Sequence, residues 1–203
     1  MYGQAMLWSR RSLAPILVVC LAACGGAADA ASPSSSASSA GGDTAEPAPP
    51  PVPAELAASA EAACAAARTW MTDAAARPLD ASCALAPVYF SWSYEWDEDA
   101  AEHRPSLDGR LEPEALAVLD WDVRCMAARG ITSIEATGML WRHGSEEYDM
   151  ALADRLARGV QDALAERGVA REAITTRSLG RELATGTDPI GWTRDVRVEL
   201  APR

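Results

Sequence analysis

The side chains with the most obvious chemical potential fall in one stretch, where His143 and Ser145 are followed by Glu146 and Glu147. A serine hydrolase needs a histidine beside the serine, an acid that orients the histidine, and an oxyanion hole. The sequence assigns neither the acid nor the oxyanion hole, and the spacing differs from the His-Glu-x-x-His pattern of zinc proteases. Ser145 is explained as a helix N-cap, with both glutamates in the first turn, where they suit the helix dipole. We therefore predict that the chain is not an enzyme.

Patterns that bind metals or cofactors are also absent from the sequence. There is no Cys-x-x-Cys pair, and both histidines are far in sequence from any cysteine. One acidic run does not follow the Asp-x-Asp-x-Asp-Gly order of a calcium loop and fits a solvated loop better. Its members are Glu95, Asp97, Glu98, Asp99 and Glu102. We expect no metal and no cofactor.

The elements that position the His143 stretch follow from apolar spacing. Alternating or continuous apolar runs predict four strands, at 87–93, 131–138, 174–179 and 196–200. Helical spacing predicts one helix from Pro113 to Gly130 and a second that begins after Ser145 and ends near Gly168. The acidic segment 94–111 is predicted to be a loop. This order, β-α-β-α-β-loop-β, predicts an α/β domain with both helices on one face of a small sheet.

The strand, loop and helix around His143 resemble those of OmpA-like C-terminal domains and peptidoglycan-associated lipoproteins. In that family a strand ends in Gly-His-Thr-Asp, a glycine follows three residues later, and then comes Tyr-Asn-x-x-Leu-Ser-x-x-Arg-Ala-x-x-Val. Gly138, Gly144, Tyr148, Leu152, Ala157 and Val160 are in register with this pattern. The resemblance spans roughly residues 88–200 and implies the family's two-layer β-α-β-α-β-β sandwich.

The resemblance also implies a role, because family members form a non-covalent tether between outer membrane and peptidoglycan. Their motif aspartate and helix arginine clasp the zwitterionic end of diaminopimelate. Here Trp141 occupies the aspartate position and Leu156 the arginine position, and neither side chain can pair with an ammonium or a carboxylate. The family's closing Asn-Arg-Arg-Val-Glu becomes Asp195-Val-Arg-Val-Glu, which keeps Arg197. The ligand site is thus degenerate, and we expect direct diaminopimelate binding to be weak or absent.

Three tryptophans lie in predicted loops that this fold brings toward one end: Trp96, Trp141 and Trp192. One interpretation is an aromatic pocket for a glycan, an apolar ligand or a partner's side chain. The other is that the rings fill a pocket that no longer binds a ligand. The candidate pocket positions are therefore Gly138, Trp141, Leu156, Arg197, Trp96 and Trp192. A Trp-rich surface would also suit a periplasmic protein-interaction module, which is the alternative to a peptidoglycan tether.

Three cysteines lie beyond the N-terminal segment, so one disulfide and one free thiol are possible, or no disulfide. Cys83 comes just before the first strand, and Cys125 lies near the end of the helix that runs back antiparallel to it. These two ends are expected to meet, which favours a disulfide between them. The rival pair is Cys64 with Cys83.

The N-terminal third of the chain has the composition of an export signal and a tether. Residues 1–23 combine two arginines with an apolar run too short to span a bilayer, as in a signal peptide. The sequence before Cys24 resembles the bacterial lipoprotein cleavage box, which implies cleavage there and lipidation of this cysteine. Residues 24–53 are rich in Ala, Ser and Pro and are expected to be a disordered linker, and the Ala-rich segment 54–78 is expected to be helical. The OmpA-like domain is predicted at 87–203.

Charge and anchoring limit the partners. The chain has no lysine and a net charge of -11, which disfavours nucleic acid and anionic membrane surfaces. By analogy with enteric bacteria, Gly25 after the lipidated cysteine implies the outer membrane, with the domain facing the periplasm. The expected partners are the lipid anchor and either peptidoglycan or envelope proteins.

Overall fold

The computed structural model describes residues 49–203. The predicted signal peptide, the lipidation site at Cys24 and most of the predicted linker lie outside the described residues. Within this part of the chain, no helix is both long enough and apolar enough to cross a membrane.

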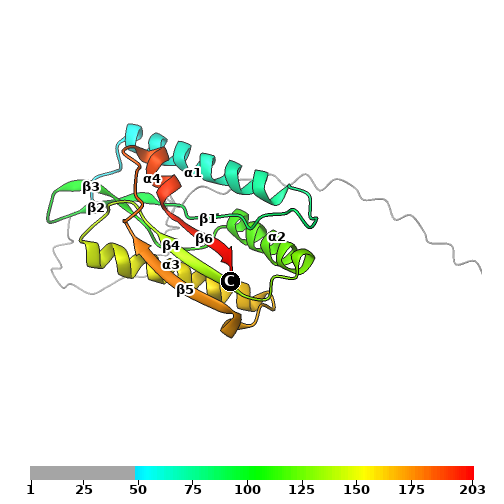
Figure 1. Ribbon diagram of the computed structural model, residues 1–203. Helices are drawn as coiled ribbons and strands as arrows, with labels where there is room; N and C mark the ends of the chain where they lie inside the picture. Colours follow the sequence, from blue (N-terminus) through cyan, green and yellow to red (C-terminus); the bar gives the residue numbers. More distant parts are fainter. Residues whose placement is uncertain (1–48) are drawn as a thin grey trace, which may run out of the picture.

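A four-stranded sheet forms the centre of the domain, in the order β1-β6-β4-β5 (Figure 1). Its strands are β1 (Val88–Tyr89), β4 (Ile134–Met139), β5 (Ile174–Gly180) and β6 (Arg197–Pro202). β4 and β5 are parallel, whereas β6 is antiparallel to both β4 and β1. Alternate residues such as Ala136 and Val198 are fully buried toward the helices, as period-two patterning requires.

Two helices cover the buried face of this sheet. α2 (Pro113–Arg129) begins with proline at its first position and ends at Gly130, whose φ of 66° is the left-handed conformation that favours glycine. α3 (Glu146–Glu166) begins at Ser145, whose side chain accepts a hydrogen bond from the Tyr148 N–H. After α1, and leaving out β2, β3, α4 and the 3-10 turn Arg171–Ala173, the order β1-α2-β4-α3-β5-β6 is the one expected from the sequence.

The Ala-rich helix α1 (Ala54–Ala75) packs along the β1 edge of the sheet, where it contacts α2 and α4 (Pro189–Asp195) (Figure 1). Its buried residues, mostly small, recur at helical spacing: Ala60, Ala63, Cys64, Ala67, Met71 and Ala74. Trp70 lies beside Tyr89 of the edge strand, with ring centroids 5.2 Å apart. The helix is therefore part of the domain's core and protects the sheet edge from pairing with another chain.

Three details of the sequence prediction are wrong. The acidic segment beginning at Tyr94 contains a hairpin, β2 (Ser93–Asp97) and β3 (Glu102–Ser106), instead of a loop. The acidic turn and Pro105 obscured the strand pattern of this segment. Its two strands pair with each other in a separate two-stranded sheet. The first strand is limited to two residues because the chain leaves the sheet to enter this hairpin. α4 was also missed, since seven residues are too few for a helical period to be recognised.

Gly138 sets the distance between α3 and β4, and its replacement gives a first prediction. A Cβ at this position would lie 2.0 Å from the Ala153 carbonyl oxygen. Gly138→Ala must therefore push α3 outward and is expected to lower the free energy of unfolding by about 1–3 kcal/mol. Gly159→Ala in α3 is the control, because the new methyl would have no atom within 4 Å apart from the backbone of α3 itself. Urea denaturation should show Gly159→Ala to be neutral or stabilised; equal losses in both variants would contradict the packing argument.

Asp122 in α2 is a fully buried carboxyl group. Its Oδ1 accepts a hydrogen bond from the Ala86 N–H at 2.8 Å, and Oδ2 has no hydrogen-bond partner within residues 49–203. Burial raises the pKa of Asp122 from 3.8 to about 7, and the bond from Ala86 offsets only part of this shift. The folded state therefore retains a proton that the unfolded state releases near its ordinary pKa.

The second prediction depends on the sign of this shift. Between about pH 4 and about pH 7 the folded state binds more protons at Asp122, so its contribution to stability falls as pH rises, by up to roughly 1.4 kcal/mol per unit. Asp122→Asn keeps the oxygen that accepts from Ala86 and does not titrate. The variant is expected to gain stability relative to the wild type across this interval. Urea denaturation against pH, with exposed Asp73→Asn as control, would contradict this if the two curves stayed parallel.

Candidate ligand pocket

A cavity of about 760 Å³ opens between the β2–β3 hairpin, the loop from β4 to α3, and α4. Its volume lies within the range of small-molecule sites. Aromatic rings and a few charged groups line it together. The lining residues are Glu95, Trp96, Asp97, Arg104, Pro105, Ser106, Trp141, Arg142, His143, Gly144, Ser145, Tyr148 and Trp192.

Packed indole rings form the base of the cavity. Trp141 and Trp192 are stacked at an interplanar angle of 26°, with centroids 6.4 Å apart. Trp92 lies 5.9 Å from Trp141 and 5.8 Å from Trp192, and its own N–H donates to the Thr193 hydroxyl at 2.7 Å. Because Trp92 is buried and hydrogen-bonded, its ring holds the rings of Trp141 and Trp192 in position. In the sequence Trp92 fell within the predicted strand 87–93, which gave no signal of the site above it.

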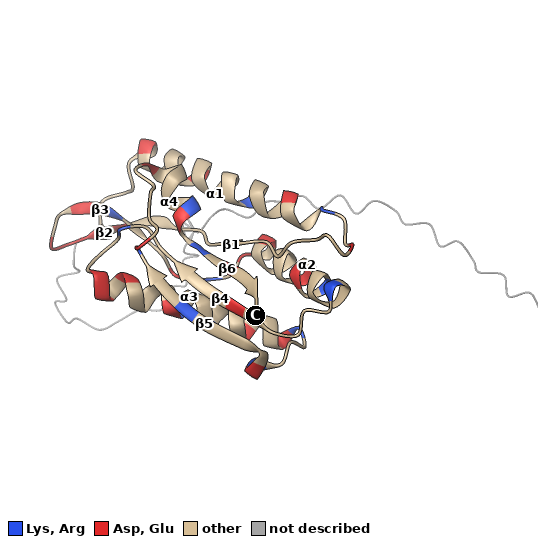
Figure 2. Ribbon diagram, in the orientation of Figure 1, with Lys and Arg blue, Asp and Glu red and all other residues tan. Residues whose placement is uncertain are grey.

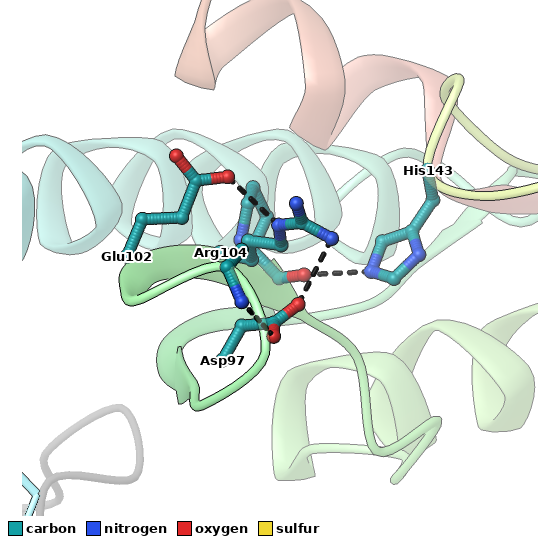
Figure 3. Close-up of polar contacts among 6 residues, drawn as sticks. Asp97, Glu102, Arg104 and His143 are labelled. Carbon is teal, nitrogen blue, oxygen red and sulfur yellow. Dashed lines mark hydrogen bonds and ion pairs between the residues drawn. The ribbon is translucent and has the colours of Figure 1, made fainter.

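His143 connects the β4–α3 loop to the hairpin. Its Nε2 lies 2.6 Å from the Pro105 carbonyl oxygen (Figure 3). Its ring stacks on Tyr148 at 22° and contacts Trp141, with centroid distances of 5.6 and 5.4 Å. His143 and Ser145, the two residues that suggested a hydrolase, therefore both have structural contacts. His143 joins the loop to the hairpin, and Ser145 caps α3.

Arg104 holds the hairpin in shape beside the cavity. Its guanidinium forms ion pairs with Asp97 at 2.9 Å and with Glu102 at 2.8 Å. Figure 3 shows both carboxylates pointing at this guanidinium. The hydrogen bond to Glu102 and the charge of Asp97 raise the pKa of Arg104 further, so it stays cationic. Figure 2 shows acidic positions along the hairpin and in the helices. Arg104 thus neutralises a local excess of carboxylates.

Asp149 and Arg181 anchor the other side of the loop. Asp149 is fully buried, and its Oδ1 accepts a hydrogen bond from the Gly144 N–H at 2.9 Å. Its Oδ2 lies 3.4 Å from Arg181 Nη1, which donates at 3.0 Å to the Gly144 carbonyl. One carboxylate and one guanidinium therefore hold both polar groups of the Gly144 backbone. Asp149 occupies the position of the motif asparagine, and Arg181 compensates the negative charge of its carboxylate.

The structure brings some of the sequence-predicted pocket residues together and separates others. Trp96, Trp141 and Trp192 all line the cavity, whereas Gly138, Leu156 and Arg197 lie outside it. Gly138 is in tight contact with α3. Leu156 is only 1% exposed, and its Cδ2 lies 3.0 Å from where a Cβ on Gly109 would be, so the segment before α2 covers it. Arg197 pairs with Glu199 along β6.

The cysteines pair as the topology argument favoured. Cys83 and Cys125 form a disulfide between the segment before β1 and the last turns of α2. Cys64 of α1 is a buried free thiol whose Sγ lies 3.6 Å from the Trp92 carbonyl oxygen. The disulfide therefore fixes α2 to the start of the sheet and leaves the cavity untouched.

The rim of the cavity carries charged groups that are not engaged within the described part of the chain. Glu95 and Arg142 have no ion pair or side-chain hydrogen bond to other described residues, and both face the cavity from its rim. No group of three or more His, Cys, Asp or Glu side chains that could hold a metal ion occurs within residues 49–203. What the site offers a ligand is aromatic surface surrounded by hydrogen-bonding groups.

Comparison with known proteins gives a partial match. No protein-family model matches the chain. Over 92 residues it is 37% identical to the peptidoglycan-associated lipoprotein of Pseudomonas putida, covering 44% of this chain and 55% of that protein. The peptidoglycan-associated lipoprotein of Pseudomonas aeruginosa is 36% identical over 92 residues, covering 44% and 54%. The chain thus spans about half the length of the curated relatives it matches.

Two solved structures are also similar. The peptidoglycan-associated lipoprotein of Burkholderia pseudomallei has a TM-score of 0.46 at 24% identity, covering 58% of this chain and 89% of that one. The OmpA-like domain of FopA1 from Francisella tularensis has a TM-score of 0.42 at 19% identity, covering 57% and 82%.

The domain is an α/β sandwich in which helices cover one face of a four-stranded sheet, as the strand and helix spacing predicted. Over 92 residues, the sequence matches confirm the predicted resemblance to peptidoglycan-associated lipoproteins.

The pair formed by Asp149 and Arg181 gives a third prediction. Arg181→Ala leaves a buried carboxylate without its cation and is expected to lower the free energy of unfolding by about 1–3 kcal/mol. Adding Asp149→Asn should recover most of this loss, because an amide oxygen still accepts from the Gly144 N–H and carries no charge. Arg177→Ala on exposed β5 is the control. A double-mutant cycle in urea that shows additive losses would contradict the proposed pairing.

Proposed function

We propose that this chain is a non-enzymatic outer-membrane lipoprotein whose OmpA-like domain faces the periplasm and associates non-covalently with peptidoglycan. The observation that carries the proposal is the 92-residue match to two proteins named peptidoglycan-associated lipoprotein. The lipoprotein box before Cys24 supports the anchor, and the Pro-rich stretch that comes after it supports a spacer between lipid and domain.

The mode of association differs from a diaminopimelate clasp. Such a clasp needs a carboxylate for the ammonium and a guanidinium for the carboxylate. Trp141 is 3% exposed and packed against other indoles, and Leu156 is in the core. Hydrogen bonds to charged groups contribute about 1.5–3 kcal/mol each, so losing both weakens diaminopimelate binding by roughly a hundredfold or more. Peptidoglycan is therefore held through groups other than this amino acid.

The net charge leads us to expect no nucleic-acid partner. Eighteen basic residues face twenty-nine acidic ones, and Figure 2 shows the acidic positions spread over the helices and the hairpin. A polyphosphate would be repelled by such a surface. The expected partners are the lipid anchor, the cell wall and proteins of the envelope.

The fourth prediction tests this function by sedimentation. The lipidated chain in detergent is expected to pellet with purified diaminopimelate-type sacculi, and excess free diaminopimelate should not release it, because the charged clasp is missing. Pelleting with cellulose is the control for adhesion to an insoluble polymer. A chain that stays in the supernatant at every sacculus concentration would contradict peptidoglycan association and leave a protein-interaction module. Release by free diaminopimelate would contradict the clasp-independent mode.

A further inference from the structure

The cavity presents aromatic rings from three separate elements. Trp96 comes from the hairpin, Trp192 from α4, and Tyr148 from the first turn of α3, where it is 51% exposed. The π-face of such a ring is electron-rich. The axial C–H bonds on one face of a pyranose ring carry slight positive charge and are flat enough to stack on it. Aromatic surfaces of this kind therefore suit sugars better than flexible aliphatic chains.

The polar groups at the rim complete this chemistry. Glu95 and Arg142 line the cavity without forming ion pairs or side-chain hydrogen bonds to other residues in the described part of the chain. Ser106 contributes a hydroxyl group to the same wall. A carboxylate accepts from sugar hydroxyls, and a guanidinium donates to hydroxyl or acetamido oxygens. These groups are free to meet a ligand, whereas Asp97 is already paired with Arg104.

The balance of charge favours a neutral ligand. Two acidic residues, Glu95 and Asp97, and two arginines, Arg104 and Arg142, line the cavity, so their formal charges cancel. An ammonium group would gain from the carboxylates and from the rings, but would also be repelled by two nearby guanidinium groups. An uncharged ring with hydroxyl and amide groups meets no such repulsion and can use every group of the rim.

We propose that this cavity binds an N-acetylated amino sugar of the peptidoglycan glycan strand. The proposal rests on the peptidoglycan association proposed above and names the part of the polymer that is recognised. The pyranose ring stacks between Trp96 and Trp192, with Tyr148 at the open side. The acetamido and hydroxyl groups bond to Glu95 and Arg142. The glycan thereby replaces the stem-peptide amino acid as the part of the polymer that is held.

Intrinsic tryptophan fluorescence of the full chain tests the proposal, since three tryptophans line the cavity. The probe is chitotriose, an N-acetylglucosamine trimer without any peptide. A saturable change in emission is expected with chitotriose. Cellotriose, which has no acetamido group, is expected to bind at least roughly fivefold more weakly, because it loses the bonds that this group makes. Free diaminopimelate should cause no saturable change.

Two variants assign the binding to the cavity. Trp96→Ala and Tyr148→Ala should each weaken chitotriose binding roughly fivefold or more, because each removes one stacking surface. Trp96 also contacts His103 within the hairpin, so the exposed Tyr148, which lies on α3, provides a second variant outside the hairpin. Leu79→Ala is the control, since this exposed residue lies outside the cavity and its loss should not change affinity. Circular dichroism verifies that each variant is folded.

The outcomes separate this proposal from the proposed function. Sacculi that pellet the chain without competition from chitotriose would overturn the sugar site and leave peptidoglycan association standing. Chitotriose binding that Tyr148→Ala and Trp96→Ala weaken, in a chain that does not pellet with sacculi, would support the sugar site and overturn the association. Chitotriose binding unchanged in both folded variants, or diaminopimelate binding that Tyr148→Ala abolishes, would overturn the sugar site.

Discussion

The close contact between β4 and α3 determines the geometry on which the rest of the domain depends. With hydrogen in place of a methyl at Gly138, the Ala153 carbonyl approaches the strand backbone directly. α3 therefore lies flat across β4 and β5, and its N-terminus is held close to the end of β4. The connecting loop is consequently short and constrained, and Trp141, Arg142 and His143 all project from it at the cavity. Packing between two backbones thus places the site.

Apolar side chains in place of charged ligand groups change both the chemistry and the stability of this region. A buried aspartate or arginine is stable only with a partner, whereas Trp141 and Leu156 gain stability from burial itself. Trp141 is fixed between Trp92 and Trp192, and Leu156 joins the core under the segment before α2. A buried charge is kept nearby at Asp149, where Arg181 and a backbone N–H compensate it. Stability and ligand chemistry are therefore coupled at these positions.

Additions to the basic sandwich provide most of the cavity wall. The β2–β3 hairpin contributes Trp96 and the Asp97–Arg104 pair, and α4 contributes Trp192. α1 supports α4 from behind, and Arg194 of α4 lies over the Trp70 ring of α1 at 5.4 Å. The disulfide between Cys83 and Cys125 fixes the segment between α1 and β1. Elements outside the Gly138–Val160 motif therefore contribute much of the cavity wall.

The sequence alone determined the order of the main elements, because their apolar periods and caps are local properties of 10 to 20 residues. Ser145, Gly130 and Pro113 mark helix ends by their own chemistry, and the spacing from Gly138 to Val160 carries the family pattern. The tertiary structure determined that the β2–β3 hairpin and α4 form, and which of the candidate pocket residues line one cavity. Trp96, Trp141 and Trp192 are far apart in sequence, and only the packed chain brings all three to one cavity. Leu156 and Arg197 looked equivalent to them in sequence, but whether a side chain faces a cavity depends on its neighbours in the folded chain. The segment at Gly109 covers Leu156, and Glu199 pairs with Arg197.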